Sequence, residues 1–110
     1  MVKFYKLARY AGDDGKSKVG FLREDGIFLP NNYALELVIY RAENGKGEKT
    51  WYVVECSSGS GLGEGKTKNA AIQAFENNVQ RLGIKGITKA VNRSIELYGR
   101  TPDHRETEVF

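Results

Sequence analysis

The hydrophobic pattern of the chain changes near residue 66. Before this point, short runs of aromatic and β-branched residues alternate with glycine, asparagine and aspartate, which is typical of strands joined by turns. Beyond it, apolar residues recur every three or four positions, which is typical of amphipathic helices. This separation of the two patterns indicates an α+β fold. With 110 residues and no long linker, we expect one domain over residues 1–99 and a loosely held polar tail over 100–110.

The first part of the chain predicts an antiparallel sheet of four or five strands. Residues 12–15 and 44–47 are rich in glycine, asparagine and aspartate, and should form turns. Asp25-Gly26 accepts the positive φ angles of a two-residue turn, so a tight hairpin is also predicted there. The expected strands cover residues 2–10, 18–24, 27–29, 34–41 and 50–56. Glycines then alternate from Gly59 to Gly65, which indicates either a flexible loop or a short strand approached closely by another group.

Two C-terminal helices are predicted, packed on one face of the sheet. The first should span about residues 68–82, with Thr67 as its N-cap and Gly83 ending it in the left-handed conformation. The second follows directly and should stop at Gly99. Their apolar faces contain Ala71, Ala74, Phe75, Val79 and Leu82 in the first helix, and Ile84, Ile87, Val91 and Ile95 in the second.

The junction between the glycine-rich stretch and the first helix is the candidate binding site. The first N–H groups of a helix have no intrahelical partners and lie at the positive end of its dipole, so anions bind there. Lysines on both sides of the cap would add to this attraction. The candidate phosphate-contacting residues are Gly63, Gly65, Lys66, Thr67, Lys68 and Asn69.

Three further cations, Lys85, Lys89 and Arg93, recur every four residues and should form a stripe on the second helix. Such a stripe is most often an ordinary solvated face. It could also follow a phosphate backbone if it lay in line with Lys66 and Lys68, and we include it as an auxiliary contact. The chain as a whole is mildly basic, with a net charge of +3, and its basic excess lies in the C-terminal half.

The spacing Gly63-x-Gly65-x-Thr67-Lys68-x-x-Ala71-x-x-Ala74, preceded by a strand hairpin, resembles the C-terminal half of the double-stranded RNA-binding domain family. The resemblance covers residues 34–82 and implies that Lys68 contacts phosphate, with Thr67 in place of the family's capping serine. It also implies a preference for RNA over DNA. The same segment resembles the HicB-type antitoxin family, whose fold is related.

Catalytic and metal chemistry find little support in the residue types present. Gly65-Lys66-Thr67 lacks the first glycine of a nucleotide-binding loop, because Ser60 stands at that position. Cys56 is best explained as a small core residue and His104 as a solvated side chain, and together they cannot form a tetrahedral zinc site. We therefore expect a protein that is not an enzyme and has no cofactor or metal.

Two functions are compatible with these residue patterns. The leading one is non-catalytic binding of nucleic acid, and the alternative is a small protein-binding module or inhibitor that uses its sheet or glycine-rich loop. An exposed aromatic residue, Trp51 or Tyr52, would anchor such a partner. One cysteine, no signal peptide and no apolar run of spanning length predict a cytoplasmic protein without membrane contact. The pattern leaves the oligomeric state open.

Overall fold

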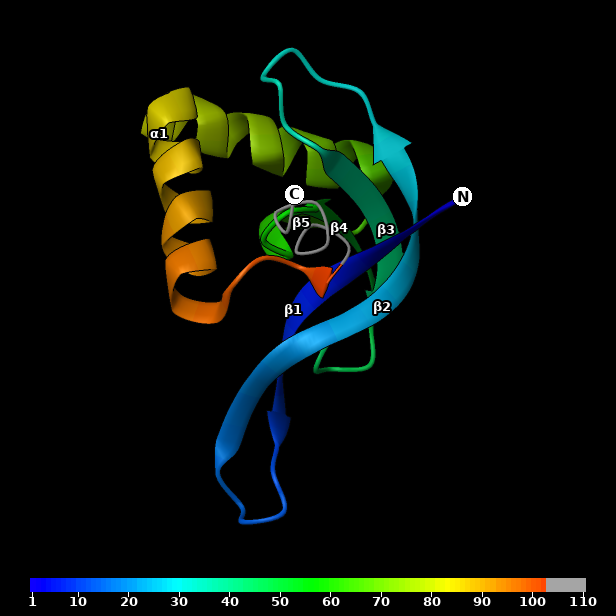
Figure 1. Cartoon of the computed structure of the whole chain (residues 1–110). Coiled ribbons are helices and arrows are strands. Elements are labelled where there is room, and N and C mark those ends of the chain that lie inside the picture. The colour runs from blue at the N-terminus through cyan, green and yellow to red at the C-terminus, as the bar shows by residue number, and fades with distance from the viewer. Residues whose placement is uncertain (103–110) are drawn as a thin grey trace.

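The computed structural model describes residues 1–102, which form an antiparallel five-stranded sheet followed by a long helix (Figure 1). The prediction of an α+β fold is confirmed. The strands lie in chain order across the sheet, each pairing with the next. The elements are β1 (Val2–Ala11), β2 (Ser17–Leu29), β3 (Leu37–Glu43), β4 (Lys49–Glu55), β5 (Ser60–Gly65) and α1 (Lys68–Tyr98).

The predicted hairpin at Asp25-Gly26 is wrong, because β2 runs through this pair without a turn. Gly26 instead marks the place where β2 changes partners, from β1 to β3. Gly26 is buried under the Phe4 ring, and an added Cβ would lie 2.9 Å from that ring and 3.3 Å from the Ile39 carbonyl oxygen. Glycine is needed here for close packing, and the pairing of β2 with both neighbours keeps the strand extended.

The turn predicted over residues 44–47 is confirmed, and it joins β3 to β4. The Asn44 carboxamide oxygen accepts hydrogen bonds from the amides of Lys46 and Glu48, which holds the turn closed. β3, however, begins at Leu37 and not at residue 34. The preceding residues form a loop around Asn31, whose carboxamide oxygen accepts from the amides of Tyr33 and Leu35.

The sheet curls so that β1 covers part of the face opposite α1. Phe4 packs there against Val38, Tyr40 and Val54 in a small buried cluster, with the Phe4 and Tyr40 rings edge to face at 5.0 Å. The Leu7 amide donates to the Gly59 carbonyl oxygen at 2.9 Å. This bond holds β1 against the segment that precedes β5 and so helps to maintain the curl of the sheet.

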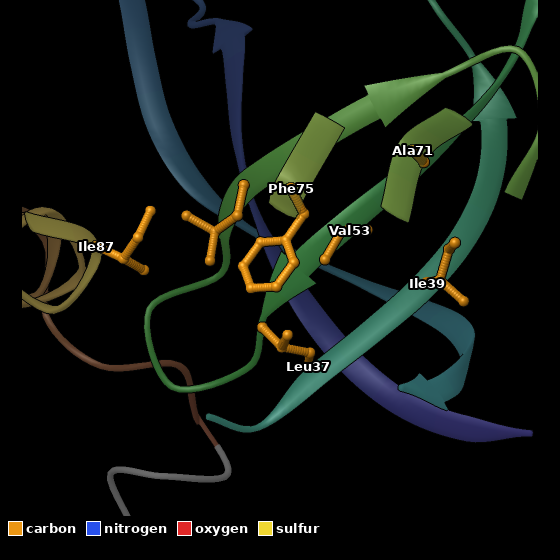
Figure 2. Close-up of a cluster of buried hydrophobic side chains, with 7 residues drawn as sticks. Leu37, Ile39, Val53, Ala71, Phe75 and Ile87 are labelled. Carbon is orange, nitrogen blue, oxygen red and sulfur yellow. The ribbon is translucent and has the colours of Figure 1, made fainter. Parts of the chain in front are cut away.

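The larger core lies between the other face of the sheet and α1. Figure 2 shows the Phe75 ring at the centre of this cluster, with Leu37 and Val53 from the sheet beside it. Ala71 and Phe75 are almost completely buried, so the helix face predicted from the 3.6-residue period is the one that packs. Ile87 enters the same cluster from the later part of α1.

The structure does not support two separate helices. α1 is a single element that turns sharply at Gly83, where φ is 72° and ψ is 163° (Figure 1). The positive φ predicted for Gly83 is present, but the helix resumes immediately afterwards. It resumes because Ile87 and Val91, on the far side of the bend, are buried and hold the second segment against the domain.

The chain stays attached to the domain beyond the end of α1 at Gly99. The Thr101 side chain is 1% exposed, its hydroxyl donates to the Cys56 carbonyl oxygen, and its amide donates to the Ser57 carbonyl oxygen. Thr101 therefore belongs to the packed domain, whereas the sequence placed the loosely held tail from residue 100. The rest of that predicted tail, residues 103–110 with His104, lies outside the described residues.

Candidate nucleic-acid interface

The start of α1 has the local structure that the sequence predicts. Thr67 has an extended backbone, with φ −128° and ψ 163°, and its hydroxyl oxygen accepts a hydrogen bond from the Ala70 amide at 3.0 Å. The first turn contains no acidic residue, and residues 66–70 are all exposed. The positive end of the helix dipole is therefore exposed, and no carboxylate in the first turn neutralises it.

Gly63 and Gly65 let β5 lie directly against α1. A Cβ on Gly63 would lie 2.7 Å from the Phe75 nitrogen and 2.8 Å from the Ala71 oxygen. A Cβ on Gly65 would lie 2.6 Å from the Cβ of Ala70. These contacts are with backbone or with the short side chain of alanine, so no side chain could move aside to make room. Both glycines thus help to set the position of the helix start.

Trp51 and Arg41 complete a cluster around this helix start. The Lys68 ammonium lies over the half-buried Trp51 ring, 5.2 Å from its centroid. Arg41 pairs with Trp51 across β3 and β4, and Trp51 pairs with Gly65 across β4 and β5. Paired residues on neighbouring strands share a face of the sheet, so Arg41, Trp51 and Gly65 form a row beneath Lys68. We call Arg41, Lys66 and Lys68 the cation cluster.

The cation cluster has no acidic partner among the described residues. The ion pairs within residues 1–102 are Lys3 with Asp25, Lys6 with Glu24, and Arg93 with Glu96. Glu64 precedes Gly65 in β5, and the alternation of strand side chains places it on the opposite face from the row. Arg41, Lys66 and Lys68 are exposed, and the cluster thus presents three positive charges beside the open end of a helix.

Lys85, Lys89 and Arg93 lie apart from the cation cluster. They are exposed on the second segment of α1 and line an open groove of about 880 Å³ together with Leu82 and Ile84. Arg93 approaches Glu96 to 3.7 Å, so the stripe is partly neutralised. The first segment of α1, from Lys68 to Leu82, is about 21 Å long at 1.5 Å per residue, and Lys85 lies beyond the bend at its far end. The structure therefore gives two basic surfaces and not a single one.

Of the residues predicted at the site, the structure gathers Lys66, Thr67 and Lys68 at one exposed corner, with Asn69 in the same first turn. Sequence reasoning missed Arg41. The turn predicted at residues 44–47 could have revealed it, because a hairpin closed there places Arg41 opposite Trp51.

In comparisons with known proteins, no family model, curated protein or solved structure matches this chain.

Cys56 and the neighbouring serines have structural roles. Burial raises the pKa of the Cys56 thiol to about 12, and Glu36 and Glu55 add to this rise. The buried Glu55 carboxylate accepts hydrogen bonds from the amides and hydroxyls of both Ser57 and Ser58, which closes the loop before β5. A thiol with this pKa is a poor nucleophile at neutral pH.

Within residues 1–102, no group of three His, Cys, Asp or Glu side chains is placed to hold a metal ion. Over the same residues, no helix has both the length and the apolar character that crossing a bilayer requires. Neither finding identifies a ligand. The cation cluster is the feature of the described surface with the clearest chemical preference, and that preference is for anions.

Proposed function

We propose that the protein is a non-catalytic nucleic-acid-binding domain that contacts phosphates through the cation cluster at the start of α1. The observation that carries this proposal is the grouping of Arg41, Lys66 and Lys68 around a positive helix end that no carboxylate of residues 1–102 neutralises. Hydrogen bonds from cations to phosphate are stronger than those between neutral groups. A polyanion would gain from all three side chains at once.

The contact with Trp51 suggests how Lys68 acts. A lysine over an indole ring is held by the attraction between its charge and the ring face, so it loses less side-chain freedom on binding phosphate. The ring face that Lys68 covers is also not free to stack on a base. We therefore expect recognition of the sugar-phosphate backbone, with little dependence on base sequence.

The stripe of Lys85, Lys89 and Arg93 would act as a second contact on the same polyanion. The first segment of α1, which lies between the two surfaces, is about 21 Å long, shorter than one turn of a B-form duplex, about 34 Å. Both surfaces could thus contact the backbone of one long nucleic acid. Because phosphates are common to RNA and DNA, the cation cluster alone does not discriminate between them, and the preference for RNA rests on the family resemblance.

Binding to a protein is the alternative function, and exposed apolar side chains favour it. Val2, Ile27 and Phe28 are 40%, 41% and 55% exposed. Val2 and Phe28 border a groove of about 200 Å³ whose walls include Phe4 and Val38. Such a surface is suited to an apolar anchor residue from a partner. Substitution Phe28→Ser should abolish this interaction and leave nucleic-acid binding intact.

The proposal is tested by fluorescence-anisotropy titration of labelled duplex RNA, duplex DNA and single-stranded RNA at about 50 mM and about 150 mM salt, a range over which counterion release changes affinity strongly. The test variant is Lys66→Ala with Lys68→Ala. The control is Lys3→Ala with Arg81→Ala, which removes the same charge from exposed positions outside the cluster.

The test variant should bind roughly tenfold more weakly than wild type, and the slope of log affinity against log salt should fall by about 1 to 2. The control should bind like wild type. Equal losses in both variants would mean that only net charge matters and would refute a localised site. Absence of binding by the wild-type protein at about 50 mM salt, where attraction between cations and phosphates is least screened, would refute the proposed function.

A further inference from the structure

The hairpin of β1 and β2 extends beyond the body of the domain. It leaves the body after Leu7, whose amide is bonded to Gly59, and we call residues 8–20 the arm. Along the arm β2 pairs with β1 alone, because its pairing with β3 is confined to Ile27–Leu29. Figure 1 shows the arm projecting from the body, away from the first segment of α1. At about 3.4 Å per residue, its paired strands reach roughly 13 Å before the turn.

The turn at the tip of the arm is ordered by its own hydrogen bonds. The Gly12 amide donates to the Lys16 carbonyl oxygen at 2.8 Å, and the Gly15 amide donates to the Gly12 carbonyl oxygen at 2.9 Å. The Asp14 carboxylate accepts from the Lys16 amide at 3.0 Å. The arm is thus a defined two-stranded ribbon with a closed end, although ribbons of this kind are only marginally stable unless something contacts them.

Cations lie on both faces of this ribbon. Tyr10 is paired with Lys18, and their side chains share one face. Arg9 lies on the other face, and Arg23 near the base of the hairpin shares that face with it. The ion pairs among residues 1–102 include none of these three cations. A flat partner could contact the cations on only one face of the ribbon. Inside a groove of nucleic acid, a phosphate backbone would lie beside each face.

The major grooves of B-form DNA and A-form RNA differ in whether a two-stranded ribbon can enter them. The major groove of B-form DNA is about 12 Å wide and 8.5 Å deep and admits a two-stranded ribbon, with a phosphate backbone on either side. The major groove of A-form RNA is too narrow and deep for side chains to enter. The arm, at roughly 13 Å, is long enough to reach the floor of the B-form groove.

The acidic residues at the tip favour the major groove over the minor groove. Asp13 and Asp14 are exposed at the turn and would approach the base edges. In the major groove, the amino groups of adenine and cytosine can donate hydrogen bonds to a carboxylate. In the minor groove, A·T pairs present only acceptors. The cations along the ribbon would therefore face the phosphate backbones on either side of the groove. The carboxylates at its tip would face the amino groups of the bases.

From this pattern we infer that the arm enters the major groove of duplex DNA and makes DNA the preferred nucleic acid. This inference rests on the proposed function, since it names the form of nucleic acid that the domain binds. It differs from the preference implied by the family resemblance, which is for RNA. Duplex RNA of the same sequence is accordingly the comparison in the experiment.

The experiment titrates labelled duplex DNA and duplex RNA of one sequence with four proteins. They are the wild type, Arg9→Ala with Lys18→Ala, the charge-retaining variant Arg9→Lys with Lys18→Arg, and the control Lys3→Ala with Arg81→Ala. The wild type should bind DNA at least roughly tenfold more tightly than RNA. Loss of Arg9 and Lys18 should weaken DNA binding by about tenfold and lower the salt slope by about 2, with circular dichroism unchanged. The charge-retaining variant and the control should bind like wild type.

Methylation by dimethyl sulfate locates the arm, because it reports guanine N7 in the major groove and adenine N3 in the minor groove. Bound wild-type protein should protect guanine N7, and the Arg9/Lys18 alanine variant should not. Protection of adenine N3 alone, or equal affinity for RNA, would overturn the inference. If DNA binding is sensitive to Lys66 and Lys68 but not to Arg9 and Lys18, the arm inference fails and the proposed function stands. If the wild type binds neither duplex, both fail.

Discussion

The substitution Gly63→Ala provides the sharpest test of how the helix start is positioned. An added Cβ would lie 2.7 Å from the Phe75 nitrogen, whereas ordinary van der Waals contact begins at 3.4 Å. To restore ordinary contact, α1 and β5 must separate by about 0.7 Å. This separation would disturb the packing of Ala71 and Phe75, whose exposed fractions are 0% and 1%.

Forcing an extra methyl group into a packed core costs about 1 to 3 kcal/mol, and contact with backbone atoms places Gly63→Ala in the upper part of this range. A loss of about 2 to 3 kcal/mol corresponds to a fall in Tm of roughly 8 to 20 °C for a domain near this size. The matched control is Gly61→Ala on the same strand. Its added Cβ would have no atom of residues 1–102 within 4 Å, so stability should change by less than about 0.5 kcal/mol.

Differential scanning calorimetry of the three proteins measures this effect, and anisotropy titration measures binding of nucleic acid in parallel. If Gly63 were needed only for the close approach of a phosphate, Gly63→Ala would weaken binding and leave Tm unchanged. That result would refute the packing explanation. A Tm that falls equally in Gly61→Ala and Gly63→Ala would also refute it, because β5 would then be sensitive to any loss of glycine.

Three further predictions concern particular residues. Thr67→Ala removes the hydrogen bond to the Ala70 amide and should cost about 1 kcal/mol in urea unfolding, whereas Thr67→Ser should retain most of the stability. Gly83→Ala places a side chain at φ 72° and ψ 163° and should cost about 1 to 3 kcal/mol. The control is Gly45→Ala, whose added Cβ would have no atom of residues 1–102 within 4 Å. Equal melting temperatures of the two variants would show that the bend is not strained. The raised pKa of Cys56, about 12 in the folded protein against an ordinary value of 9.0, should make its alkylation by iodoacetamide near pH 9 slow until urea is added. Because the unfolded thiol ionises near pH 9 and the folded one near pH 12, the free energy of unfolding should fall as pH rises between these values, and Cys56→Ala should lose this part of the pH dependence.

The sequence by itself determined the features that depend on local backbone chemistry. Asn44 closes its turn with its own side chain, Thr67 caps the helix, and Gly83 and Gly99 take positive φ where the period of apolar residues predicted a break or an end. Each of these depends on neighbouring residues within a few positions. A short stretch of sequence is sufficient to predict them.

Only the tertiary structure decided the features that depend on distant neighbours. Asp25-Gly26 has turn chemistry, yet Phe4 covers Gly26 and pairing with β1 and then β3 keeps the strand extended through it. Gly83 breaks the helix, yet burial of Ile87 in the shared core makes the two segments one element. The same distinction applies to the candidate site. The sequence is sufficient to place Lys66, Thr67 and Lys68 at the start of a helix. Arg41 lies beside them only because of the register between β3 and β4. Packing energies of several kcal/mol per buried side chain exceed the local preferences of a turn or cap, so burial decided wherever the two competed.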